Sequence, residues 1–234
     1  MEEEKSLKFS FDTLIIPLLF VFIMWFVFFV EITFGHDFTK YGIYPRSFFG
    51  LRGVIFSPFI HSTSKHLYNN TMPILILSTA LFYFYKNISW KVLLFGWILS
   101  GFLTWLIGRT SYHIGASGLI YVLVSFILFK GLFTHNLRLI ALSLVVVFVY
   151  GSMFWYVLPI AEERISWEGH LAGFISGVLL SFVFKNNILK PRKYIWETDK
   201  YVEEDDPFLK HFDENGNFIP TSEMEEENQE DSHP

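Results

Sequence analysis

Long apolar runs broken by short polar segments fill most of the chain up to about residue 185. The first run, Leu14 to Val30, contains no charged residue, and its length is close to the roughly 20 residues that a helix needs to cross a hydrocarbon core. It is too long for the apolar region of a signal peptide, and no small-residue cleavage site follows it. The pattern therefore predicts a first membrane helix that is retained.

Five more apolar stretches of helical length cover residues 65–85, 90–107, 117–129, 137–158 and 167–184. The connection over residues 35–60 is rich in Gly, Pro and aromatic residues. It is too apolar to be fully solvated, which predicts that part of it lies in the membrane interface. The predicted fold class is an all-α membrane protein, a six-transmembrane-helix bundle over residues 11–186 with a partly embedded first loop.

The composition supports a membrane location. Hydrophobic residues make up 52% of the chain and aromatic residues 20%. Charged residues make up 18%, whereas about a quarter is usual in soluble domains. We therefore predict an integral membrane protein in contact with the lipid bilayer. The chain has no cysteine, which excludes disulfides and thiolate zinc sites. We expect no cofactor, no bound metal and no nucleic-acid partner.

The charged residues lie mostly outside the apolar stretches. Residues 187–234 contain the acidic runs Glu203–Asp206 and Glu223–Glu227, and such a segment cannot build a core. We predict a disordered cytoplasmic tail there and a short cytoplasmic N-terminus over residues 1–10. Six spans place both termini on one side, whose segments hold ten Lys and Arg against six on the other. This excess predicts cytoplasmic termini in a multi-pass protein of the plasma membrane.

Polar residues open the second, fourth and sixth predicted helices, whereas the other three are apolar nearly all round. With cytoplasmic termini, the three polar openings lie at one depth near the outer face. Polar groups there are costly unless they face the bundle interior or water, so they are candidates for function. The fourth helix has only about 14 residues before Lys130, against the roughly 20 needed to span. We expect its start to lie below the outer surface, at the floor of a cavity.

The fourth helix opens with Gly115, Ala116, Ser117 and Gly118. The glycines leave the backbone open to close approach, and the unpaired N–H groups of a helix N-terminus favour an anion. These features make Ser117 a candidate nucleophile. The alternative is that the small residues only allow two helices to pack closely.

His170 opens the sixth helix and shares a face with Gly173 and Gly177, because residues three and four positions apart are neighbours on a helix. This small-residue pattern predicts a close helix pair, which would bring His170 to Ser117 as a general base. Alternatively, His170 only reaches toward the outer interface. Glu168 projects about 200° away from His170 on a helix, so we predict a Ser-His dyad without a carboxylate.

His66 and Asn70 share one face of the second helix because they are four residues apart, and His61 precedes that helix. The side chains of His66 and Asn70 can both donate hydrogen bonds. Fixed donors aimed at a developing negative charge are what an oxyanion hole requires. The alternative is that they cap the start of the helix.

Three segments together resemble the rhomboid family of intramembrane serine proteases. They are the spacing of His61, His66 and Asn70, the Gly115-Ala116-Ser117-Gly118 box with Tyr121, and the Gly169-His170-Leu171-Ala172-Gly173 box with Gly177. Their order, spacing and placement on alternate helices agree with that family over about residues 11–186.

The resemblance implies that Ser117 is the nucleophile and His170 the general base. It implies an oxyanion hole formed by His66, Asn70 and the Ser117 backbone N–H, and it implies that Tyr121 packs against the His170 ring. The implied activity is that of a serine endopeptidase that cuts transmembrane protein substrates near the outer face of the membrane.

The chain departs from the family pattern in two places. It carries Asn69-Asn70 where the family more often has Asn-Met, and it has no acidic residue between Lys65 and Tyr85. The first loop, which contains Arg52, resembles the family's lateral loop but does not align residue by residue.

Other classes of protein fit the sequence less well. The chain has no His-Glu-x-x-His zinc motif and no pair of aspartates in the predicted spans. A polar-lined transporter is disfavoured because no charge pair or inverted repeat is visible. The main alternative is a rhomboid-like protein that binds membrane clients without cutting them.

Overall fold

A computed structural model describes residues 11–134, 136–159, 166–184, 194–199 and 201–222. The chain divides into two compact units, residues 1–190 and residues 191–234, which we describe separately. The described residues form helices and turns, and the extended pairing among them is limited to two isolated bridges, Ile43 with His113 and Phe212 with Phe218.

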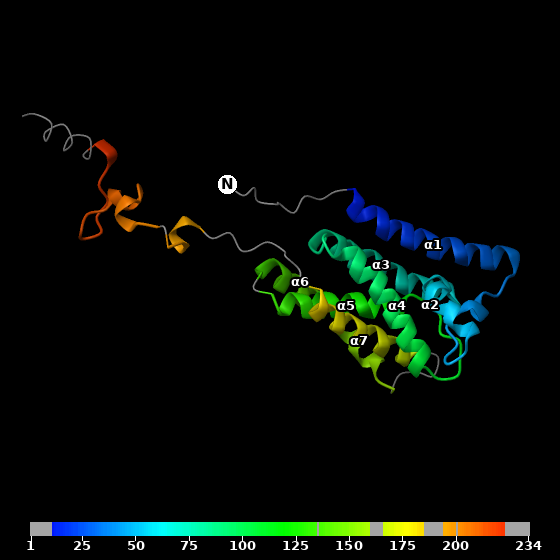
Figure 1. The fold of residues 1–234 in the computed structure, drawn as a ribbon. Coiled ribbons are helices and arrows are strands. Elements are labelled where there is room, and N and C mark those ends of the chain that lie inside the picture. Colours follow the sequence, from blue (N-terminus) through cyan, green and yellow to red (C-terminus); the bar gives the residue numbers. More distant parts are fainter. Residues whose placement is uncertain (1–10, 135, 160–165, 185–193, 200, 223–234) are drawn as a thin grey trace, which may run out of the picture. The chain divides into compact units, whose positions relative to one another are not determined.

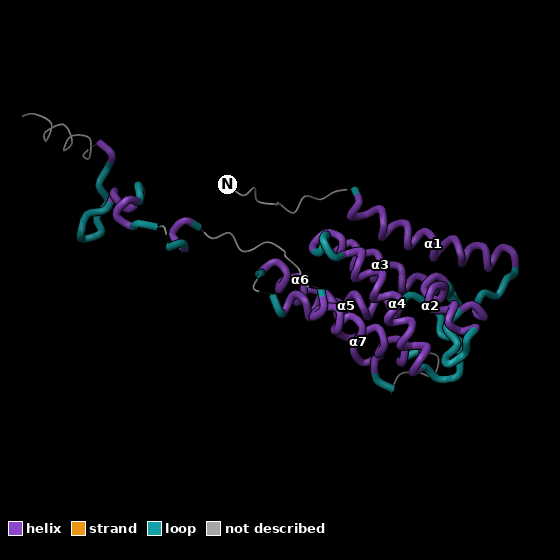
Figure 2. Tube along the Cα trace, viewed as in Figure 1, coloured by secondary structure: helices purple, strands orange, loops and turns teal. Residues whose placement is uncertain are grey.

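Six long helices are found among the described residues of the first unit (Figure 1). They are α1 (Asp12–Phe34), α3 (Ser64–Phe84), α4 (Ser89–Ile107), α5 (Ser117–Leu132), α6 (Leu137–Tyr150) and α7 (Trp167–Val183). Apart from α6, their bounds follow the stretches expected from the apolar pattern to within a few residues. Figure 2 shows the helical character of this unit and the irregular connection between α1 and α3.

By length and composition, three segments of the described residues are able to cross a membrane: Thr13–Phe34, Ser89–Ile107 and Leu137–Val157. The apolar helices α5 and α7 are shorter, with 16 and 17 residues. The count of six spans therefore stays a prediction. Short helices such as α5 reach across a membrane only if one end lies inside it or the bilayer is locally thin.

Helix α5 lies at the centre of the first unit and packs most extensively against α7. Its buried apolar side chains, among them Ile120, Leu123 and Phe126, form much of the core together with residues of α3. By contrast, α1 and α6 leave large apolar side chains such as Phe22 and Phe148 exposed. An exposed apolar surface of this kind suits contact with lipid.

Glycines allow the backbones of α5 and α7 to touch. A Cβ atom added to Gly173 would lie 2.1 Å from the carbonyl oxygen of Gly118, and one added to Gly177 would lie 2.1 Å from Ser125 Oγ. Ser125 Oγ also donates a hydrogen bond to the Phe174 carbonyl at 3.0 Å across the same seam. This close packing places the N-terminal end of α7 next to the N-terminal end of α5.

Helix α6 differs from the fifth predicted helix, which was expected over residues 137–158. Its α-helical part ends at Tyr150, and Gly151–Val157 continue as the 3₁₀ helix η4. Two carbonyls of η4 accept hydrogen bonds from side chains: Met153 from the Tyr121 hydroxyl and Tyr156 from His170. A backbone whose carbonyls bind side chains of other helices departs easily from the α-helical ladder.

The first loop is built from short helical turns: η1 (Thr39–Tyr41), η2 (Phe49–Arg52), α2 (Gly53–Phe56) and η3 (Ser57–Phe59). Arg52 donates a hydrogen bond to the Lys40 carbonyl at 2.9 Å, and its guanidinium lies 4.6 Å from the centre of the Tyr41 ring. The loop is thus ordered by its own contacts. Its position in the membrane interface stays a prediction.

Within its described residues, 194–199 and 201–222, the second unit has the 3₁₀ turns η5 (Ile195–Glu197), η6 (Glu203–Asp205) and η7 (Leu209–His211), none with a buried residue. The Asp213 carboxylate accepts hydrogen bonds from the backbone N–H groups of Asn215 and Asn217, both at 2.8 Å, and holds a tight turn. The expected disorder of the tail stays a prediction. The expected cytoplasmic segment 1–10 and parts of the tail lie outside the described residues.

Candidate active site

Ser117 and His170 meet at the N-terminal ends of two packed helices. Ser117 is the first residue of α5, and His170 lies in the first turn of α7. The Ser117 Oγ and His170 Nε2 atoms are 3.0 Å apart, within hydrogen-bond distance. His170 is only 8% exposed. The structure therefore brings together two residues that are 53 positions apart in the sequence.

The His170 ring is held on two further sides. Its face stacks on Tyr121, with ring centroids 4.4 Å apart. Its Nδ1 atom lies 3.0 Å from the Tyr156 carbonyl oxygen. A carbonyl oxygen can only accept a hydrogen bond, so Nδ1 carries the proton of the neutral ring. Nε2 is then free to accept a hydrogen bond from the Ser117 hydroxyl.

Tyr156 is a member of the site that the sequence did not indicate. The expectation was that His170 would be held by the Tyr121 ring and by Ser117. The Tyr156 contribution comes from its backbone carbonyl, a group that every residue has, so no residue type marks it in the sequence. The Tyr121 hydroxyl donates to the Met153 carbonyl at 2.6 Å, which attaches the same segment, η4, to the site a second time.

His66 and Asn70 lie beside the segment that leads to Ser117. A Cβ atom on Gly115 would be 2.7 Å from the His66 ring and 3.8 Å from Asn70 Nδ2. Gly115 also has φ near +100°, a conformation that side chains other than hydrogen disfavour. Asn70 is buried, whereas Asn69 is exposed, so Asn70 is the amide next to Gly115. One Asn70 N–H donates to the His66 carbonyl at 2.9 Å, which leaves the second for another acceptor.

His61 lies behind His66 and is almost completely buried, with 1% of its surface exposed. The two rings meet edge to face, with centroids 5.0 Å apart. The pKa of His61 is lowered to about 3, mainly by burial and also by the neighbouring His66, while a hydrogen bond from the ring to the Phe59 carbonyl acts in the opposite direction. His61 is thus a neutral ring that supports His66.

A cavity of about 30 Å³ lies beside Ser117. Its polar lining comes from the first loop, α4 and the segments before α5 and α7 and includes Ser57, Ser100, Thr104, His113 and Ser166. Hydroxyl and imidazole groups in a space of this size can hold water. Among the described residues, no group of three or more His, Asp or Glu side chains gathers as a metal site.

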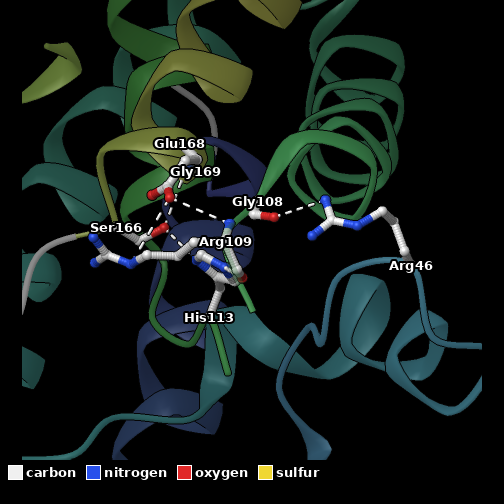
Figure 3. Close-up of polar contacts among 7 residues, drawn as sticks. All are labelled: Arg46, Gly108, Arg109, His113, Ser166, Glu168 and Gly169. Atoms are coloured by element: carbon white, nitrogen blue, oxygen red, sulfur yellow. Dashed lines mark hydrogen bonds and ion pairs between the residues drawn. The ribbon is translucent and has the colours of Figure 1, made fainter. Parts of the chain in front are cut away.

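The Glu168 carboxylate binds Arg109 (Figure 3). Its Oε1 atom accepts a hydrogen bond from the backbone N–H of Arg109 at 3.2 Å and lies 3.8 Å from Arg109 Nε. The His170 Nδ1 position that an aspartate takes in a Ser-His-Asp triad is filled here by the Tyr156 carbonyl.

The helical fold and the paired serine and histidine define the class of protein. Helices with apolar surfaces enclose a polar site, as is typical of integral membrane proteins that work on groups inside the bilayer. The sequence model of the rhomboid domain matches residues 49–187, more than half of the chain. The protein therefore belongs to the rhomboid family, and the family resemblance is confirmed.

Relatives with this similarity occur in mycobacteria. The chain is 36% identical over 175 residues to an uncharacterized protein of Mycobacterium tuberculosis and to one of Mycobacterium bovis, covering 71% of this chain and 72% of each relative. It is also 36% identical over 141 residues to an uncharacterized protein of Mycobacterium leprae, covering 57% of this chain and 56% of the relative.

Proposed function

We propose that the protein is an intramembrane serine endopeptidase that cleaves transmembrane protein substrates near the outer face of the membrane. The observation that carries the proposal is the chain of contacts from Ser117 Oγ through the His170 ring to the Tyr156 carbonyl. It supplies an activated hydroxyl, a base with an accepting nitrogen, and a group that orients the base.

The chemistry follows from this arrangement. Ser117 Oγ attacks the carbonyl carbon of the substrate peptide bond while His170 Nε2 takes the hydroxyl proton. The Tyr156 carbonyl, hydrogen-bonded to Nδ1–H, then stabilises the positive charge on the ring. The imidazolium gives its Nε2 proton to the leaving amine, which yields an ester on Ser117. A water molecule hydrolyses that ester with His170 again acting as the base, and Ser117 is regenerated.

The oxyanion formed in each step needs donors close to Ser117. His66, Asn70 and the Ser117 backbone N–H are the groups proposed for this role, because the first two lie against Gly115 and the third opens α5. Such donors stabilise a developing charge most strongly where water is excluded. The polar cavity beside Ser117 is the proposed source of the hydrolytic water.

Substrates must expose a peptide bond to Ser117. A helical segment hides its carbonyls in backbone hydrogen bonds, so the proposed substrates unwind locally near the cleavage point. Residues that weaken a helix, such as Gly and Pro, favour this unwinding.

Labelling of Ser117 with a fluorophosphonate tests the proposal. The reagent reacts with a serine hydroxyl that a base has activated, so we expect the purified protein to be labelled and to cleave a model transmembrane substrate. Ser117→Ala and His170→Ala are expected to abolish both while the protein still folds. A folded protein that neither labels nor cleaves would support the alternative, a rhomboid family protein that binds membrane clients. Cleavage retained by Ser117→Ala would refute the assigned nucleophile.

A further inference from the structure

A polar cluster lies next to the C-terminal end of α4 (Figure 3). It joins Arg109 and His113, from the loop over residues 108–116, to Ser166 and Glu168 at the start of α7. The loop runs directly into Ser117, and Glu168 is two residues before His170. The cluster therefore connects the two segments that carry the proposed catalytic pair.

Glu168 is a buried carboxylate, with 3% of its surface exposed. Burial of a charged group is costly unless it is paired and hydrogen-bonded. Its partners are the backbone N–H of Arg109, 3.2 Å from Oε1, and the Arg109 guanidinium, whose Nε is 3.8 Å from the same oxygen. These contacts attach the start of the loop to the first turn of α7.

A second connection runs through His113 and Ser166. His113 Nε2 lies 3.1 Å from the Arg109 carbonyl, which can only accept, so Nε2 carries the proton of the neutral ring. The Ser166 hydroxyl then donates a hydrogen bond to His113 Nδ1 at 2.6 Å. Ser166 Oγ in turn accepts the backbone N–H of Gly169 at 3.2 Å and caps α7. Burial lowers the pKa of His113, which favours the neutral ring that this chain of hydrogen bonds requires.

The other side of the loop is attached to the first loop of the protein. Ile43 and His113 exchange backbone hydrogen bonds at 2.9 and 2.8 Å. Arg46, which has φ of 57°, donates to the Gly108 carbonyl at 2.9 Å (Figure 3). The loop before Ser117 is thus held between the first loop and α7.

We infer that Glu168 is a positioning residue, which together with Ser166 and His113 holds the loop before Ser117 at the distance from α7 that the Ser117 and His170 pair requires. This inference rests on the proposed function. Glu168 touches neither reacting atom, because its carboxylate binds Arg109 and the His170 Nδ1 atom binds the Tyr156 carbonyl. It acts through the backbone on both sides of the site.

The inference predicts a graded effect at Glu168. In Glu168→Gln, the amide oxygen can still accept from the Arg109 N–H, so we expect the rate of fluorophosphonate labelling to fall less than about tenfold. This is far below the ~10⁴ that conversion of the acid to its amide costs a Ser-His-Asp triad. In Glu168→Ala no acceptor remains. We expect its rate to fall about ten- to hundredfold, since a misplacement of about 1 Å can cost a hundredfold.

Glu31 offers a matched control. Its Oε1 atom accepts the backbone N–H of Phe38 at 2.9 Å at the end of α1, so Glu31→Ala also removes a carboxylate that binds a loop N–H. We expect Glu31→Ala to lower the thermal stability in detergent but to leave the labelling rate of the folded protein unchanged. If Glu168→Ala does not fold, Ser166→Ala serves as the second variant. It removes only one hydroxyl group and with it the second connection, and we expect it to slow labelling as well.

A distance measurement separates this inference from the proposed function. The chain has no cysteine, so spin labels can be placed on Cys variants of the exposed residues Thr110, in the loop, and Ile175, on α7. We expect a narrow distance distribution in the otherwise unchanged protein and in Glu168→Gln, and a broader one in Glu168→Ala. An unchanged distribution in Glu168→Ala would overturn the positioning role whatever the activity. A protein that is never labelled at Ser117 would contradict the proposed function alone.

Discussion

Replacement of Gly173 by alanine tests whether contact between the α5 and α7 backbones is what brings the proposed catalytic pair, Ser117 and His170, together. The new Cβ atom would lie 2.1 Å from the Gly118 carbonyl oxygen and 2.9 Å from Tyr121 Cβ. The first neighbour is backbone, so it cannot turn aside as a flexible side chain does. Relief of the contact therefore requires the two helices to separate by about 1 Å or more.

The separation acts where the pair lies, because Gly118 follows Ser117 and Gly173 is three residues after His170. The distance from Ser117 Oγ to His170 Nε2, now 3.0 Å, would lengthen to about 4 Å, beyond hydrogen-bond reach. We expect kcat to fall about a hundredfold. We also expect a loss of about 1–3 kcal/mol in the free energy of unfolding, as is usual for overpacked sites.

The assay is single-turnover cleavage of a transmembrane model substrate in detergent, with the rate of fluorophosphonate labelling measured in parallel. Gly151→Ala is the matched control. Its Cβ atom would lie 3.7 Å from Val147 Cγ1, an ordinary contact, and its φ of −60° suits alanine. Gly151→Ala should keep nearly full activity. A folded Gly173→Ala protein as active as this control would refute the reasoning.

Three further predictions follow from the site. His66→Ala and Asn70→Ala should each lower kcat more than they weaken substrate binding, with about 3 kcal/mol added to the barrier per donor lost; an unchanged kcat in both would assign them to helix capping. Truncation after residue 187 should leave cleavage nearly intact, because every proposed site residue lies in the first unit; a well-folded but inactive truncated protein would show that the tail takes part. His61 should make the fold less stable in acid. Because its pKa in the fold is about 3 and about 6.5 when unfolded, the unfolded chain binds the proton between these values. The free energy of unfolding should therefore fall with decreasing pH over that range, by up to about 1.4 kcal/mol per pH unit from this residue. Thermal unfolding of His61→Gln should show a shallower pH dependence, and an equal dependence in both proteins would argue against a buried neutral His61.

The helices and the family could be predicted from the sequence because their signals are local. Apolar runs mark helices by length and composition alone, and the six long helices follow those runs. The spacing of His66 and Asn70, and that of His170, Gly173 and Gly177, places residues on one helix face by geometry that does not depend on the rest of the fold. These local patterns led to the rhomboid family, which the family match confirms.

Other features depended on which backbone groups the tertiary structure brings together. The Tyr156 carbonyl, the 3₁₀ form of residues 151–157 and the pairing of Glu168 with the Arg109 N–H involve main-chain atoms. Every residue carries these atoms, so the sequence contains no mark of which of them will be used. The sequence alone therefore determined which side chains are available for chemistry and on which helices they lie. Only the packing of α5, α7 and the segments around them decided which backbone groups hold those side chains in place, because such contacts form between residues far apart along the chain.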